Sequence, residues 1–370
     1  CWLVCAGMSG HRSRGRSEQI PVGLPREVSL LEWARSYERG DLRADVLAGL
    51  TLAAILVPQS MAYALLAGLP PEAGLYAGTL PVLVYAVFGT SRHLSVGPVA
   101  LVSLLTLAAI GDAAPAGREL ETAGVLALMV GAAHVVLGFA RLGFLVNYIS
   151  RPVMVGFMAA AAVIIAASQL RGLTGIDAER GEDFVGIVRH LVDAYESIHW
   201  TTVVIGVAAI STLVLWRRWG RGIPGPLLVA AGATLIVWLA NLDDDGVDVV
   251  GTIPSGIPGP ALDGIGMGVV VDLLPATIVI TLVGYLESIS IAKTYAQRFG
   301  HRLRPNQEMV AVGLSNASAG LVGGYPVSGS FSRTAADVAS GGRTQLSKVV
   351  SAIVVLLVLV ALTPVLEPLP

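Results

Sequence analysis

The chain contains repeated apolar runs of about 20 residues, which is the length that a helix needs to cross a lipid bilayer. Hydrophobic residues make up 54% of the chain and charged residues only 14%, whereas soluble domains carry about 25% charged residues. A chain of this composition could not cover its surface in water, so the sequence predicts an all-α polytopic membrane protein. Eleven spans are expected, near residues 45–67, 73–89, 95–110, 121–140, 152–170, 200–216, 223–240, 268–292, 306–322, 328–340 and 345–364.

Two of these spans, 95–110 and 328–340, are short and begin near a proline in a run of small residues. Proline suits the first turn of a helix because its φ is already helical and it has no N–H to leave unpaired. Each span is therefore interpreted as a half-helix that starts inside the membrane. The residues expected at the two half-helix N-termini are Gly97, Pro98, Pro326, Ser328, Gly329 and Ser330.

Interrupted helices at corresponding positions of two halves are typical of inverted-repeat transporters. The third and the tenth span carry the interruptions, which predicts repeats of seven helices each. A complete protein would then have fourteen spans, of which about eleven are present. The sequence is therefore expected to be truncated.

Lysine and arginine set the expected orientation. With a cytoplasmic N-terminal segment over 1–44, 19 of the 24 Lys and Arg residues fall on the cytoplasmic side and 4 outside, in agreement with the positive-inside rule. The expected location is a cell membrane, of the bacterial inner-membrane type. A net charge of −2 argues against nucleic acid as a partner. Cys1 and Cys5 have no Cys or His cluster beside them, so neither a disulfide framework nor a metal site is expected.

The two half-helix N-termini are expected to face one point. Unpaired N–H groups and the positive ends of two helix dipoles would meet there, which predicts an anion site. A polar neutral ligand, or glycine-rich kinks kept for packing, are the alternatives. Val99 should lie on one side of the site, and Phe331 and Ser332 on the other. Arg333, the one basic residue placed within a span, should either contact the anion or pair with Asp337 four residues later.

Several motifs resemble those of a known family. They are Leu-Val-Pro-Gln-Ser-Met-Ala-Tyr-Ala at 56–64, Phe-Gly-Thr-Ser-Arg-His-Leu-Ser-Val-Gly-Pro at 88–98, Gly-Tyr-Leu-Glu-Ser-Ile at 284–289, Gly-Gly-Tyr-Pro-Val-Ser-Gly-Ser-Phe-Ser-Arg at 323–333 and Gly-Gly-Arg-Thr-Gln at 341–345. From about residue 41 to its end, the chain resembles the SulP (sulfate permease) family, whose animal branch includes prestin and pendrin.

The resemblance implies a seven-plus-seven inverted repeat, similar to that of uracil permease, divided into a core domain and a gate domain. Residues 45–140 and 268–370 would belong to the core domain and 141–240 to the gate domain, while 241–267 would form an extracellular loop. Members usually continue into further gate helices and a cytoplasmic STAS domain, which this sequence lacks. A full-length member is expected to form a homodimer.

The resemblance also implies roles for Gln59 and Tyr63, which lie four residues apart on one face of the first span. In the family these positions line the anion pocket. An amide and a phenol can each donate a hydrogen bond to an oxyanion without burying a charge. The alternatives are that Tyr63 only packs and that Gln59 bonds a carbonyl freed by Pro58.

Glu287 lies deep in the span at 268–292. Loss of hydration favours the neutral acid, so this carboxyl is expected to bind a proton and to couple it to anion binding, as an acid here does in proton-coupled members of the family. A sodium site shared with Ser288 and a purely structural role are the alternatives. His134 and Asn316 are expected to make interhelical hydrogen bonds rather than to bind a ligand.

The sequence thus predicts secondary active transport of an oxyanion, with sulfate as the leading candidate, by proton-coupled symport with alternating access. An uncoupled anion channel or exchanger, a bicarbonate or dicarboxylate carrier and a nucleobase permease are the alternatives. No nucleophile–base pairing, metal-ligand spacing or phosphate-binding glycine loop suggests an enzyme, and no cofactor is expected.

Overall fold

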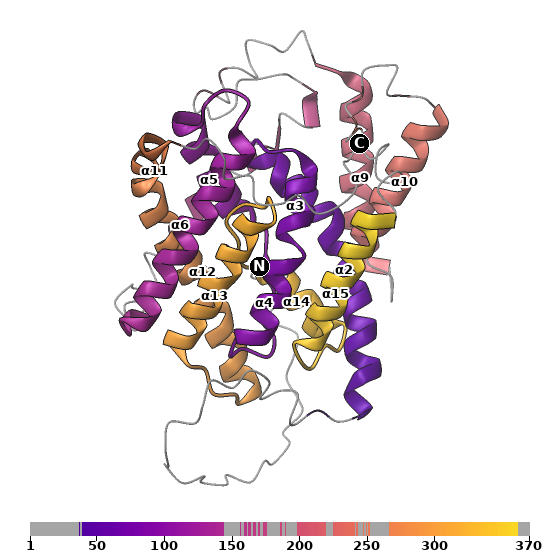
Figure 1. Cartoon of the computed structure of the whole chain (residues 1–370). Helices are drawn as coiled ribbons and strands as arrows, with labels where there is room; N and C mark the ends of the chain where they lie inside the picture. Colours follow the sequence, from indigo (N-terminus) through magenta and orange to yellow (C-terminus); the bar gives the residue numbers. More distant parts are fainter. Residues whose placement is uncertain are drawn as a thin grey trace.

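The computed structural model describes residues 39–143, 198–219, 225–240 and 266–361, together with Tyr37 and isolated residues between 156 and 251. Most of the span predicted at 152–170 lies outside the described residues. Figure 1 shows the helices and strands in chain order. The first part of the chain forms α2 (Arg39–Leu66), α3 (Pro71–Ala77), α4 (Leu80–Phe88), β1 (Val96–Gly97), α5 (Ala100–Ala113) and α6 (Glu119–Phe139). The later part forms α9 (Trp200–Trp219), α10 (Gly225–Ala240), α11 (Met267–Asp272), α12 (Leu274–Phe299), α13 (Pro305–Leu321), β2 (Ser328–Gly329), α14 (Phe331–Ala339) and α15 (Leu346–Ala361).

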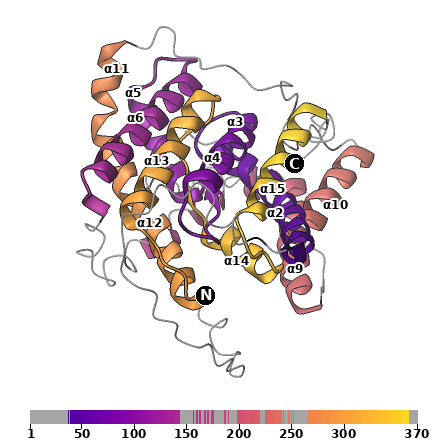
Figure 2. The same ribbon diagram turned by 60° about the horizontal axis from the view of Figure 1, so that its bottom comes forward.

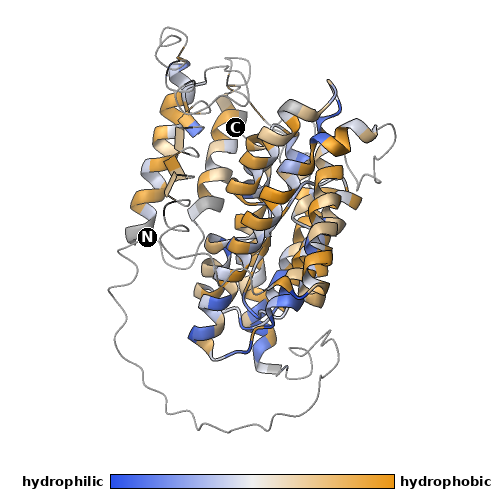
Figure 3. Cartoon of the chain, turned by 90° about the vertical axis from the view of Figure 1, so that its left-hand side faces the viewer, coloured by the Kyte–Doolittle hydropathy of each residue, from blue (hydrophilic) through white to orange (hydrophobic). Residues whose placement is uncertain are grey.

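Long apolar helices confirm the membrane class of the chain. Within the described part, three helices are long and apolar enough to cross a bilayer, at Gly40–Leu66, Glu119–Phe139 and Leu274–Phe299. They fall on the spans predicted at 45–67, 121–140 and 268–292. Figure 3 shows hydrophobic residues along most of the length of the helices, with hydrophilic residues gathered toward the ends.

The span predicted at 73–89 is two helices, α3 and α4, rather than one. The backbone N–H of Gly78 closes the last turn of α3, and the Thr79 hydroxyl donates to the carbonyl of Tyr76 at 2.8 Å. Pro81, in the first turn of α4, has no N–H with which to continue the earlier helix. These three residues end one helix and start the next.

Helices α6 and α13 pack side by side through glycines. A Cβ at Gly131 would lie 2.8 Å from the carbonyl oxygen of Gly313, and a Cβ at Gly320 would lie 2.5 Å from that of Gly124. Only residues without a side chain permit backbones to approach this closely, as is common between helices in membranes. This pair of helices forms one wall of the core.

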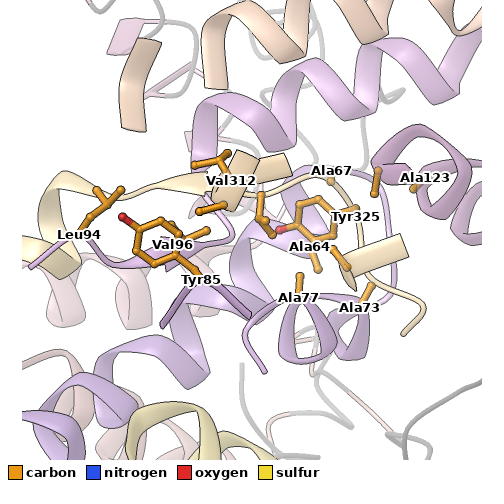
Figure 4. Packing of buried hydrophobic residues seen from close by; sticks show 14 of the residues in the cluster. Ala64, Ala67, Ala73, Ala77, Tyr85, Leu94, Val96, Ala123, Val312 and Tyr325 are labelled. Carbon is orange, nitrogen blue, oxygen red and sulfur yellow. The ribbon is translucent and has the colours of Figure 1, made fainter. Parts of the chain in front are cut away.

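Small residues fill the centre of the molecule (Figure 4). Alanines from several elements surround the ring of Tyr325, so helices and loops meet there at short range. Tyr85 and Leu94, on either side of the turn that leads to β1, are also buried in this cluster. The core therefore supports the two segments that precede α5 and α14.

A two-stranded antiparallel ladder joins the two halves of the chain, and the sequence did not predict it. Val96 pairs with Gly329, and Gly97 pairs with Ser328. The backbone N–H of Ser330 extends the contact by donating to the carbonyl of Ser95 at 2.9 Å. The starts of α5 and α14 are thereby fixed relative to each other.

The loop before α15 is tied to two distant segments. The Asp45 carboxylate of α2 accepts hydrogen bonds from the backbone N–H groups of Arg343 (2.7 Å) and Thr344 (3.1 Å). The Gln345 side chain donates to the carbonyl of Ser91 at 2.7 Å. Figure 2 shows α14, which ends at this loop, between α12 and α2.

Candidate functional site

Short helices, α5 and α14, are present near both predicted half-helices, but they begin later than the sequence indicated. Helix α5 starts at Ala100, two residues after Pro98, and α14 starts at Phe331, five residues after Pro326. Gly97, which was expected at a helix start, lies in a strand instead, as do Ser328 and Gly329. Strand β2 lies between Pro326 and α14, whereas β1 ends just before Pro98 and only Val99 separates that proline from α5.

The two helix starts present backbone donors. The first N–H groups of any helix have no partner within that helix. Val99, the N-cap of α5, is extended and provides no side-chain cap. Ser330 caps α14, because its Oγ accepts from the backbone N–H of Arg333 at 3.3 Å. Val99 is buried, whereas Phe331 and Ser332 are exposed.

Arg333 lies in the first turn of α14 and is fully buried. Its Nη1 donates to the carbonyl of Pro98 at 2.6 Å and to Oε1 of Gln59 at 3.3 Å. Its Nε and Nη2 are buried and have no hydrogen-bond partner among the described residues. Gly97 leaves room for this guanidinium, since a Cβ there would stand 3.1 Å from Nη2.

Gln59 and Tyr63 approach the Arg333 side chain from α2, and both are half-buried. The Gln59 amide donates to the Tyr63 hydroxyl at 3.0 Å and lies 3.5 Å from Oγ of Ser332. Ser332 in turn lies 3.1 Å from Oγ of Ser330. The Gln59 side chain thus faces the start of α14, and within the described part of the chain it bonds Tyr63 and Arg333 rather than a carbonyl freed by Pro58.

Glu287 approaches this group from α12. Its carboxyl contacts the hydroxyl of Ser328 and lies within electrostatic reach of Arg333. In the part of the chain that is placed, its Oε2 is buried without a hydrogen-bond partner. The Ser288 hydroxyl accepts from the N–H of Gly329 at 2.8 Å and lies 3.1 Å from the hydroxyl of Ser328. The predicted site residues on α2, α12 and α14, together with the β1–β2 ladder, therefore lie around the guanidinium of Arg333.

The alternative partner of Arg333, Asp337, is bound by other residues. The Lys348 ammonium donates to one Asp337 carboxylate oxygen at 2.5 Å, and the Ser347 hydroxyl donates to the other at 2.6 Å. An intrahelical pair between Arg333 and Asp337 is therefore not formed. Lys348, which the charge analysis counted with the cytoplasmic segments, is 1% exposed.

Asn316 bonds the segment before β2 rather than another helix, whereas His134 of α6 contacts the backbone of Thr281 in α12 as well as its own helix. The Asn316 side chain accepts from the N–H of Val327 at 2.9 Å and donates to its carbonyl at 3.0 Å, just before β2. It thus serves as a backbone-like partner for an irregular segment. The His134 Nδ1 lies 2.9 Å from the carbonyl of Val130 in its own helix.

Sequence reasoning assigned no role to two buried polar pairs of the core, Ser103 with Tyr325 and Tyr85 with Glu308. The Ser103 hydroxyl of α5 lies 3.2 Å from the hydroxyl of Tyr325, which is fully buried. Glu308 of α13 accepts from the phenol of Tyr85 and from the backbone N–H of Thr90 at 2.9 Å. A carboxylate in the first turn of a helix ordinarily indicates only a favourable dipole contact, so Glu308 carried no special signal. No group of three or more His, Cys, Asp or Glu among the described residues could hold a metal ion.

The fold is similar to that of solved membrane transport proteins. The structure of SLC26A9 superposes with a TM-score of 0.86 at 26% identity, covering 92% of this chain and 57% of that one. Murine SLC26A9, described as an anion transporter in the inward-facing state, gives 0.85 at 25% identity, covering 93% and 60%. The transmembrane domain of the cyanobacterial bicarbonate transporter BicA gives 0.81 at 22% identity, covering 90% and 86%, and supports the fold alone.

Residues 42–370 match the sulfate permease family, and the chain belongs to that family. It is 40% identical over 338 residues to a probable sulfate transporter of Mycobacterium tuberculosis, covering 91% of this chain and 60% of the relative. It is 36% identical over 347 residues to the chloroplastic sulfate transporter 4.1 of Arabidopsis thaliana, covering 91% and 50%. The chain thus spans 60% or less of the length of these two relatives.

Proposed function

We propose that this protein binds sulfate between the starts of α5 and α14 and carries it across the membrane. The observation that carries this proposal is Arg333, a fully buried cation with two unpartnered donor groups among the described residues. A buried charge is costly unless it is paired, and an oxyanion at the two helix starts would pair it. The relatives named as sulfate transporters support sulfate as the substrate.

Gln59 and Tyr63 would complete the coordination from α2, and Ser332 from α14. The Gln59 amide and Tyr63 hydroxyl already lie 3.0 Å apart, so both can turn donors toward one ligand. Val99 would shield one side of the site from water. The seven-plus-seven repeat is part of the proposal: the antiparallel ladder brings the two half-helices together from the two halves of the chain.

Glu287 would couple protons to the anion. Protonation removes a negative charge that would otherwise repel the anion beside Arg333, so proton binding favours sulfate binding. Its unpartnered Oε2 is the position from which a proton would enter and leave. Movement of the loaded site between the two membrane faces would then yield symport by alternating access.

Labelled sulfate uptake into proteoliposomes, with and without an inward proton gradient, tests both parts. We expect gradient-stimulated uptake in the wild type and its loss in Glu287→Gln. Asp272→Asn is the matched control. This acid is exposed at the end of α11, just before α12 begins, so its substitution should leave the stimulation by the gradient intact. Absence of uptake by correctly inserted protein would exclude sulfate. Uptake that ignores both the gradient and Glu287→Gln would exclude proton coupling.

A further inference from the structure

Helix α14 carries two charges of opposite sign on one face. Arg333 and Asp337 are four residues apart, the spacing at which side chains of a helix meet and oppositely charged ones pair. Both are fully buried, where their attraction is less screened than at a surface. An acid at this position competes with any external anion for the charge of Arg333.

Lys348 removes this competition. Its ammonium donates to Asp337 at 2.5 Å, and the Ser347 hydroxyl occupies the second carboxylate oxygen at 2.6 Å. Gly342 packs directly on the carboxylate, since a Cβ there would stand 2.4 Å from Oδ1. Both oxygens of Asp337 are therefore directed away from Arg333 and toward the start of α15.

The position of Lys348 is itself fixed. Its ammonium also lies 3.4 Å from the carbonyl of Arg92 and 3.3 Å from that of Thr344. The lysine is 1% exposed, and a buried ion pair of this kind is in general a weak source of stability compared with apolar packing. The free-energy cost of burying the two charges of Lys348 and Asp337 is explained if the pair has a function other than stabilising the fold.

We propose that Lys348 determines the anion affinity of the site by neutralising Asp337, so that the charge of Arg333 stays available to the substrate. The inference rests on the proposed sulfate site at Arg333. Lys348 is a positioning residue in this scheme, because it acts through Asp337 and touches no substrate.

The expected size of the effect follows from helix geometry. Asp337 lies six residues beyond the first residue of α14, which is about 9 Å along the helix axis. One uncompensated unit charge at that distance from a doubly charged sulfate changes the affinity by roughly 500-fold when the effective dielectric constant is about 20. A change of this size is easily resolved in a transport assay.

The test compares the sulfate KM for uptake by the reconstituted protein and three variants, with thermal stability measured in parallel. Lys348→Met leaves Asp337 uncompensated and should raise the sulfate KM by roughly 500-fold. Asp337→Asn removes the competing acid and should leave KM at or below the wild-type value. The double variant Asp337→Asn/Lys348→Met should restore the wild-type KM.

The asymmetry between the two single variants distinguishes this role from a structural one. A pair that only holds the fold would make both single variants lose stability and uptake rate to a similar extent, and that result would overturn the proposal. An unchanged KM in Lys348→Met would overturn it as well. If Lys348→Met fails to insert, a raised KM in Asp337→Asn alone refutes the inference. Wild-type protein without sulfate uptake would instead refute the proposed function.

Discussion

Gly97 should tolerate no side chain, because two features of the structure exclude one. Its φ is +153°, in a region that residues with a Cβ rarely adopt, and the strain of forcing one there is about 1–3 kcal/mol. A Cβ would also lie 3.1 Å from Nη2 of Arg333, which is closer than ordinary van der Waals contact. We therefore expect Gly97→Ala to lower stability by about 1–3 kcal/mol and to shift the guanidinium away from Pro98.

Gly111 is the matched control for this substitution. It lies in α5, only fourteen residues further along the chain, and a Cβ there would meet no atom within 4 Å. Alanine is favoured over glycine within a helix by about 1 kcal/mol, so Gly111→Ala should be neutral or stabilising. Thermal unfolding in detergent and the sulfate KM for uptake are the measurements. Equal stability and equal KM in the two variants would show that the reasoning about Gly97 is wrong.

Two further substitutions test other parts of the structure. Asn316→Ala leaves the buried N–H and carbonyl of Val327 without their side-chain partner and should cost about 2–4 kcal/mol; an unchanged thermal midpoint would contradict this. In the loop before β1, burial, reinforced by the charge of Lys348, lowers the pKa of His93 to about 3. The unfolded chain then binds more protons below pH 6.5, so lowering the pH from 7.5 to 5.5 should cost about 1.4 kcal/mol more in the wild type than in His93→Gln. If the thermal midpoints of the wild type and of His93→Gln fell equally between these two pH values, His93 would not be the source of the pH dependence.

The long helices could be predicted from the sequence, and the starts of α5 and α14 to within a few residues, because length, hydropathy and proline are local signals. The ladder could not. Val96 and Gly329 each contribute to a strand of only two residues, which is too short to show a period of two. Its pairing also joins positions more than 200 residues apart, and no local pattern reports such a contact.

The family motifs and the rarity of charge in a span both indicated Gln59, Tyr63 and Arg333 as site residues. Hydrogen bonds place these side chains close together, and their role in anion binding stays a prediction. The partner of Asp337 was missed because helical spacing favours Arg333, four residues away, over Lys348, eleven residues away in the next helix. Only the turn after α14 brings that lysine back onto the carboxylate.

The ladder between β1 and β2 also constrains how the protein can work. Backbone hydrogen bonds of the ladder join the start of α5 to the start of α14, so neither helix start can shift without the other. The two helix starts would therefore keep the same positions relative to a bound ion while the ion crosses the membrane. The affinity for the ion would then differ between the two faces through the protonation of Glu287, and release would depend on that protonation and on the ion concentrations on the two sides of the membrane.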